Sequence, residues 1–326
     1  MEYFLQYVTI KNLQVNEIYG WIFAIYRVIN YIQNWDWEIS IWWIAISTIS
    51  IINILYWIKT YNWFKKQTPN WTMEDSKFIR LQLFLSSGYV FVCAFRSFLP
   101  RADVQKVVIW DTWLSSILVG RSVATIGELC LAAQLAIFLF YLSKRYNSPS
   151  IKNISLIVFP VILIAEVFSW YSVLTTNYIG NTTEESLWCL NGFLLIISSL
   201  ILMKKTSGKE KFYISLVGVY NTLYVIFMLT VDVPMYYQRF LMDSVNHKEY
   251  KTLLQGFHEI NSTWYSTQNY IDWQGELSWM FLYFTTAVWV SLILIRTPLL
   301  INSISYKKNP VNNYLEKERK VTNFNF

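Results

Sequence analysis

The stretch from Trp113 to Tyr146 reads WLSSILVGRSVATIGELCLAAQLAIFLFYLSKRY. It is long and apolar enough for a membrane-spanning helix, yet it carries Arg121 and Glu128 ahead of an unbroken apolar half. The two charges lie seven residues apart, so they share nearly the same helical face, about two turns from each other. Because an ion in hydrocarbon costs at least about 2.5–3.5 kcal/mol, this face is predicted to look into a helix bundle.

The composition supports an integral membrane protein. Of the 326 residues, 54% are hydrophobic and only 15% are charged, whereas a soluble domain carries about 25% charged residues. Sixteen tryptophans and 23 tyrosines are typical of aromatic belts at the two membrane interfaces. The net charge is +6, but the cations lie between apolar segments, so they indicate orientation in a membrane and not a nucleic-acid partner.

Seven apolar segments are predicted to span the membrane as an all-α bundle. They cover residues 39–58, 78–99, 113–146, 151–175, 186–203, 212–233 and 276–300. Asp232 and Pro234 are expected to end the sixth span, because proline disrupts a helix interior. The segment 18–32 is shorter and contains Arg27, which favours an interfacial or re-entrant helix within an N-terminal segment of residues 1–37. If it inserts fully, the chain has eight spans.

Lysine and arginine in the connections predict the orientation. The loops after the first, third and fifth spans are basic, as is the tail of residues 304–326, whereas the linker 176–185 has neither Lys nor Arg. The transmembrane domain, residues 38–303, is therefore expected to place its N-terminus outside and its C-terminus in the cytoplasm. Arg101 and Lys106, on the outer side, are the exception. The pattern does not distinguish a bacterial inner membrane from a eukaryotic membrane.

With this orientation, the intramembrane charges gather toward the outer ends of the spans. The set comprises Arg96, Arg121, Glu128, Glu166, Asp232, Arg239 and Glu276, with Glu184 and Glu185 opening the fifth span. The inner halves are nearly free of charge; Arg80 is near enough to the interface to snorkel. One-sided charge across six spans predicts a polar vestibule that opens to the outer face.

Aromatic and amide side chains lie at the same end and join the predicted ligand-binding set. They include Trp170, Asn177 and Tyr236. Aromatic faces attract cations, so together with the carboxylates they suit a cationic or sugar-like head group. The long connection 236–275 holds apolar residues at helical spacing between Asn246 and Asn261, which predicts either a lid over the vestibule or a helix that covers the bundle end.

Several kinds of cofactor site are excluded by missing residues. The seventh span has no lysine for a retinal Schiff base, and both histidines, His247 and His258, lie in the outer connection. Histidine-ligated haem within the bundle and a two-histidine zinc motif are therefore excluded, and no metal site is predicted. The cysteines Cys93, Cys130 and Cys189 have no paired spacing and are expected to be inert.

Three functions fit these patterns. The leading hypothesis is a protein that binds or transports a small molecule or lipid head group, with Glu128 and Glu166 as anionic contacts or proton carriers and Arg121 and Arg96 beside them. The competing hypothesis is a membrane-embedded enzyme that acts on a lipid or glycan, with Glu128, Glu166 and Asp232 in acid–base or metal chemistry. The third is a structural or assembly subunit whose ion pairs fix helix register.

Overall fold

The computed structural model describes residues 35–67 and 71–301. This part of the chain contains seven helices long and apolar enough to cross a membrane, which supports the predicted integral membrane protein. The segment 18–32 and the tail 304–326 lie outside the described residues, so the total number of spans and the sidedness of the termini remain predictions.

The helices extend beyond most of the predicted apolar segments, because polar residues continue them past the hydrocarbon region. The first six spans are α2 (Trp37–Gln67), α3 (Met73–Phe98), α4 (Ile117–Arg145), α5 (Pro149–Thr175), α6 (Ile179–Met203) and α7 (Gly208–Phe227) with its extension. The seventh is α11 (Leu277–Leu282), η4 (Tyr283–Ala287) and α12 (Val288–Leu294) in succession, and α13 (Thr297–Leu300) follows. A short helical turn, η2 (Trp113–Ser115), precedes α4.

The expected end of the sixth span at Asp232 and Pro234 is wrong. The helix continues through a π-helical turn, η3 (Met228–Asp232), into α8 (Val233–Val245). Within the turn, the Val233 N–H donates to the Met228 carbonyl, five residues back. The wider turn accommodates Pro234, which has no N–H of its own and whose ring would otherwise crowd the preceding turn.

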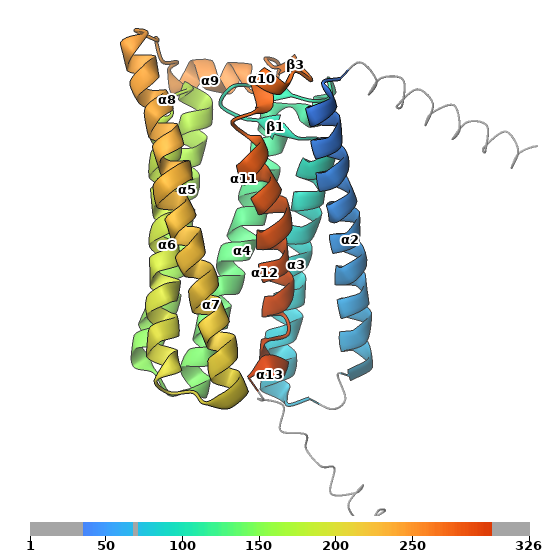
Figure 1. The fold of residues 1–326 in the computed structure, drawn as a ribbon, viewed down its shortest axis with the longest axis vertical. Helices are drawn as coiled ribbons and strands as arrows, with labels where there is room; N and C mark the ends of the chain where they lie inside the picture. The colour runs from blue at the N-terminus through green and yellow to red at the C-terminus, as the bar shows by residue number, and fades with distance from the viewer. Residues whose placement is uncertain (1–34, 68–70, 302–326) are drawn as a thin grey trace, which may run out of the picture.

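Consecutive helices pack side by side from α2 to α6, and α7 packs along α6. The last span, α11–α12, instead packs against α2, α3 and α4. Figure 1 shows the resulting upright bundle, with α7–α8 and α11–α12 close together at one end and diverging toward the other. The α7 helix thus lies at the margin of the bundle, and α13 contacts it near its start.

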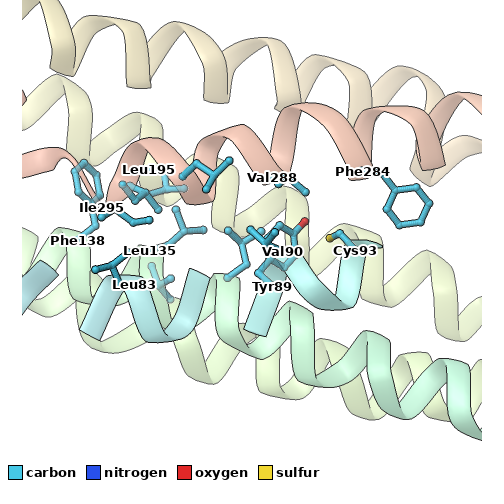
Figure 2. Close-up of a cluster of buried hydrophobic side chains, with 14 of the residues drawn as sticks. Leu83, Tyr89, Val90, Cys93, Leu135, Phe138, Leu195, Phe284, Val288 and Ile295 are labelled. Carbon is cyan, nitrogen blue, oxygen red and sulfur yellow. The ribbon is translucent and has the colours of Figure 1, made fainter. Parts of the chain in front are cut away.

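Two kinds of contact hold the centre of the bundle. Figure 2 shows apolar side chains from several helices, including Leu135, Phe138 and Leu195, gathered in the buried core. Beside them the amide of Gln134 donates to the side-chain oxygen of Gln82 at 2.9 Å, and Ser291 donates to Gln134 at 2.6 Å. These bonds satisfy buried polar groups while joining α3, α4 and α12.

One end of the bundle, here called the capped end, is covered by the connections. A small sheet pairs β1 (Arg101–Ala102), β2 (Val107–Val108) and β3 (Tyr265–Ser266), and two short helices, α9 (Leu253–Glu259) and α10 (Tyr270–Trp273), lie beside it. The opposite end, called the basic end, carries Lys65, Lys66, Lys144, Arg145, Lys204 and Lys205.

The helix in the long connection is shorter than the spacing between Asn246 and Asn261 indicates. It starts only after Thr252, whose hydroxyl accepts from the Gln255 N–H in a capping box. Of the apolar residues, Ile260 is buried, while Leu253, Leu254 and Phe257 are exposed. An ion pair ties this helix to the turn between β1 and β2: Lys106 Nζ lies 2.7 Å from Glu259 Oε2, and Lys251 bonds the same oxygen.

This ion pair should make the cap sensitive to acid. Hydrogen bonds from Lys106 and Lys251 lower the pKa of Glu259 below its ordinary value of 4.5. The stabilisation is therefore complete above that value and is lost as pH falls through the lowered pKa. We expect hydrogen exchange in residues 103–108 and 253–260, corrected for intrinsic rates, to accelerate below about pH 4.5. Glu259→Gln should give the fast exchange already at pH 7, and the same exchange in Glu249→Gln would contradict this role.

Candidate functional site

Arg121 lies at the centre of a buried ionic cluster between α4, α5 and α6. Its Nη2 atom is 2.8 Å from Glu166, 2.9 Å from Glu128 and 3.8 Å from Glu184. Thr125 donates to the same oxygen of Glu166 at 2.6 Å, and Trp170 donates to Thr125 at 3.1 Å. The four charged residues are at most 5% exposed, so solvent screens their interactions little.

Small residues let the helices around this cluster approach closely. Gly127, on the next turn of α4 from Arg121, lies against Val92 of α3, with no room for a Cβ atom. Gly120 lies against the guanidinium of Arg101 in the same way. Close approach of backbones at small residues is the common packing mode of helices in membranes. Here Arg96 of α3 and Arg121 of α4 both reach the same carboxylate, Glu128.

Arg96 extends the cluster toward α3 and α11. Its guanidinium lies 3.6 Å from Glu128 and 3.9 Å from Asp103, and it stands over the ring of Tyr283 at 5.5 Å. The Tyr283 hydroxyl donates to Glu128 at 3.2 Å. Tyr283 starts the π-helical turn η4, and Asn53 donates to the backbone carbonyl of the next residue, Phe284, at 3.1 Å. The turn therefore helps to position the tyrosine beside Glu128.

A second ionic group surrounds Glu276 at the start of α11. Arg239 and Gln105 donate to one of its oxygens at 2.7 and 2.8 Å, and Trp279 donates to the other at 2.6 Å. Arg239 also stands over the ring of Tyr236 at 5.4 Å. These bonds join α8, α11 and the turn between β1 and β2. Glu276 is thus fully paired.

Unlike the carboxylates of the two ionic groups above, Glu185 and Asp232 lie near each other without an arginine or lysine partner among the described residues. Asp232, in the π-helical turn η3, is 6% exposed, and it lies near Glu185 of α6 in the cavity wall. Among the described residues, neither carboxylate has a lysine or arginine within ion-pair distance. Two neighbouring carboxylates repel each other when both are ionised, so a proton or an added cation would stabilise the pair.

These groups line one end of a cavity of about 1040 Å³. At the capped end its wall contains six carboxylates, those of Asp103, Glu128, Glu184, Glu185, Asp232 and Glu276. Three arginines, Arg96, Arg101 and Arg121, lie at the same end. Toward the basic end the wall is mainly apolar, with Leu131, Leu135, Phe138 and Leu195 (Figure 2 shows the last three). The cavity therefore has an acidic compartment and an apolar one.

Several buried polar atoms of residues in the cavity wall have no hydrogen-bond partner within the described part of the chain. They include Nε and Nη2 of Arg101, Oδ1 of Asp103 and Oδ1 of Asn191. Arg101 is 1% exposed, and burial lowers its pKa to about 10, so it is still charged at neutral pH. Buried polar groups are normally bonded, so these donors and acceptors mark unsatisfied positions in residues of the cavity wall.

The structure brings most of the predicted site residues together. Arg96, Arg121, Glu128, Asp232, Tyr236 and Glu276 line the cavity. Glu166 and Trp170 lie behind the wall in the Arg121 network, and Arg239 supports Glu276 from the side. Asn177 does not line the cavity: its side chain accepts from the Ile179 N–H in the turn between α5 and α6.

The predicted set omitted several residues of the cavity wall. Glu184 and Glu185 are charges at the start of a span, and nothing in the sequence separates their roles. Arg101, which the sequence places in a connection on the outer side, is buried over Phe95. Arg296, after the charge-free part of the last span, lines the basic end of the cavity and bonds Thr60 at 3.4 Å.

Glu128, Glu166 and Glu184 are also the one group of described residues with the spacing of metal ligands, with oxygens within 4.8 Å of one another. Carboxylate oxygens suit a hard divalent cation such as Mg²⁺ or Ca²⁺. However, the Arg121 guanidinium occupies the space among them and already bonds two of the three. A metal ion would have to displace a buried arginine, so this arrangement suits an ion-pair network better than a metal centre.

Comparison with known proteins gives no relative from which to infer a function. No protein-family model, curated protein or solved structure matches the chain. Any functional conclusion therefore rests on the geometry of the cavity and its wall.

Arg121 should be essential for a folded bundle. Arg121→Met would leave three carboxylates buried without their shared cation, and removal of one partner from a buried ion pair costs roughly 3–5 kcal/mol. We expect a lower melting temperature and little monodisperse protein in size-exclusion chromatography. Lys144→Met, which removes an exposed partner of Glu74, should cost only about 0–1 kcal/mol. Equal stability of the two variants would refute the central role of Arg121.

Proposed function

We propose that this membrane protein binds an amphipathic molecule whose positively charged head group enters the acidic compartment and whose apolar part extends toward the basic end. The observation that supports this most directly is the division of the cavity into an acidic and an apolar compartment. Ligand sites are typically concave and largely apolar, with a few converging polar groups that fix orientation. A transporter and a receptor-like sensor would both use such a site.

The charges of the wall favour a cation. Six carboxylates face three arginines at the capped end, and Glu185 and Asp232 have no cationic partner in the described chain. Aromatic rings of Tyr236, Trp279 and Tyr283 line the same compartment and offer faces to an ammonium group. A cation at Glu185 and Asp232 would relieve the repulsion between their carboxylates, whereas an anion there would increase it.

The two alternative functions explain fewer features of the cavity. An enzyme with acid–base or metal chemistry would use the carboxylates of Glu128, Glu166 and Glu184. However, Arg121 lies among these carboxylates, and Glu166 lies outside the cavity wall. A purely structural role explains the Arg121 network well. It does not explain the neighbouring carboxylates of Glu185 and Asp232 or the unpartnered polar atoms around the cavity. We therefore give the binding function first place and the enzyme second.

A binding test can use three probes with one chain length and different head groups: dodecylamine, dodecanol and dodecanoate. With the purified protein in a neutral detergent, dodecylamine should raise the melting temperature most, because a ligand that binds the folded state stabilises it. Glu185→Gln combined with Asp232→Asn should remove this increment, since an unpaired buried charge costs about 2 kcal/mol or more, a factor of roughly 30 in affinity.

The matched control is Glu74→Gln, an exposed carboxylate at the basic end, which should keep the full increment. Each increment is measured against the same variant without ligand, so a change in intrinsic stability does not affect the comparison. The proposal fails if the three probes stabilise the protein equally, or if the double variant keeps the response to dodecylamine.

We further propose that the capped end faces away from the cytoplasm. The basic end carries the lysines and arginines of the loops between α2 and α3, α4 and α5, and α6 and α7, as the positive-inside rule requires of cytoplasmic loops. In intact cells, a membrane-impermeant thiol reagent should label a cysteine placed at exposed Glu249 but not one placed at exposed Lys209 until the cells are lysed. The reverse labelling pattern would invert the orientation.

A further inference from the structure

The cavity has a side opening between α7 and the last span. Six residues both line the cavity and are exposed at the bundle surface: Leu216 and Leu223 of α7, and Leu282, Thr286, Ile293 and Leu300 of the opposite wall. The two walls approach at the basic end, where α7 contacts α13, and diverge toward the capped end (Figure 1). The exposed residues therefore mark the two rims of a slit, here called the α7–α12 slit.

The slit faces the hydrocarbon of the bilayer. Five of its six rim residues belong to the segments Gly208–Val245 and Leu277–Leu294, which are apolar enough to span a membrane. The rims are uncharged and, apart from Thr286, aliphatic, as expected for a surface in contact with lipid chains. Inside the slit the wall is mainly apolar, with Leu135 and Phe138 on α4 and Leu195 on α6, although Asn221 and Arg296 also line it. An acyl chain in the bilayer can thus continue into the cavity without leaving a mainly apolar environment.

At the capped end, by contrast, the wall is tied together. The turn between β1 and β2 supplies Asp103, Val104 and Gln105 to the cavity wall, and Gln105 bonds Glu276. The neighbouring Lys106 is paired with Glu259. Residues 246–261 do not reach the cavity wall, so the turn, and not the α9 segment, covers this end. The side opening offers the more direct way in for an apolar molecule.

The acidic compartment contains both positively and negatively charged side chains that a ligand could bind. Arg101 lines the cavity, and two of its N–H donors have no hydrogen-bond partner among the described residues. Arg96 also lines it, 3.6 Å from Glu128 and 3.9 Å from Asp103, and stands over the rings of Trp279 and Tyr283. Guanidinium groups of this kind bind phosphate oxygens well. Glu185 and Asp232, on the other wall, have no ion-pair partner among the residues that the structure describes. A head group with a phosphate and an amine would satisfy both sets of groups.

We infer that the ligand is a phospholipid with an amine-bearing head group, which enters sideways from the bilayer through the α7–α12 slit. Its ammonium group lies against Glu185 and Asp232, its phosphate accepts hydrogen bonds from Arg101, and its acyl chains occupy the slit and the apolar compartment. The choice of head group rests on the proposed function above, whereas sideways access rests on the slit alone.

Photolabelling tests this inference in the full chain, reconstituted in lipid nanodiscs. The probes are phosphatidylethanolamine and phosphatidylglycerol that carry a diazirine on the same acyl carbon, and adducts are mapped by mass spectrometry. We expect adducts on Phe138 and Leu195, which are 1% and 4% exposed and accessible only from within the cavity. Adducts there should be severalfold more abundant with phosphatidylethanolamine, while exposed Leu55 and Val167 should be labelled equally by both probes.

Two leucines of similar exposure provide a matched pair for the slit. Leu223→Trp, at the rim, should reduce labelling of Phe138 and Leu195 severalfold. Leu229→Trp, which lies on the same span away from the cavity wall, should leave it unchanged. Sideways access is refuted if Leu55 and Val167 are labelled in the wild type but Phe138 and Leu195 are not. It is also refuted if soluble phosphoethanolamine raises the melting temperature as much as lysophosphatidylethanolamine does.

Separate results of these experiments test the assignment of the head group. Loss of the preference for phosphatidylethanolamine in Glu185→Gln combined with Asp232→Asn supports it, and equal cavity labelling by both wild-type probes overturns it. If the cavity is not labelled but dodecylamine still stabilises the protein, the inference fails and the proposed function stands. If the cavity is labelled but dodecylamine has no effect, lipid access stands and the proposed cation site fails.

Discussion

The shared ion pair of Arg121 is the interaction on which the polar half of the bundle depends. One guanidinium nitrogen serves carboxylates from three positions, Glu128 on its own helix, Glu166 on α5 and Glu184 on α6. Three negative charges around one positive charge would be costly in hydrocarbon, and the approach of Arg96 to Glu128 offsets part of the excess. The cluster thereby fixes how α4, α5 and α6 lie relative to one another.

This fixed geometry separates two adjacent carboxylates. Consecutive residues of an α-helix point about 100° apart, so Glu184 and Glu185 cannot face the same neighbour. With α6 held by Arg121 through Glu184, the next residue points toward the π-helical turn of the sixth span and meets Asp232. A structural ion pair thus positions the unpaired carboxylates that give the cavity its acidic character. Of two adjacent glutamates, one is thus engaged in the ion-pair network and the other lies near Asp232 at the cavity.

The sequence predicted the features that arise from hydrophobicity and charge within single segments. The apolar runs predicted seven of the observed helices, and the one-sided charges indicated the polar compartment. The sequence did not predict that the helix would pass Pro234, because a proline normally ends such a helix and only a π-helical turn, set by packing, accommodates it. Nor could it predict that Arg101 would be buried, because this depends on the space that Gly120 leaves on α4.

The cavity itself follows from how the last span packs. Because α11–α12 lies against α2, α3 and α4, it does not close onto α7, which is held mainly by α6. The π-helical turns η3 and η4 lie on the two walls that diverge, and each places a polar side chain, Asp232 or Tyr283, at the acidic compartment. In water, such a gap between helices would be closed by the hydrophobic effect. In a bilayer, lipid chains solvate apolar walls as well as other helices do, so the gap between α7 and α12 has no comparable tendency to close.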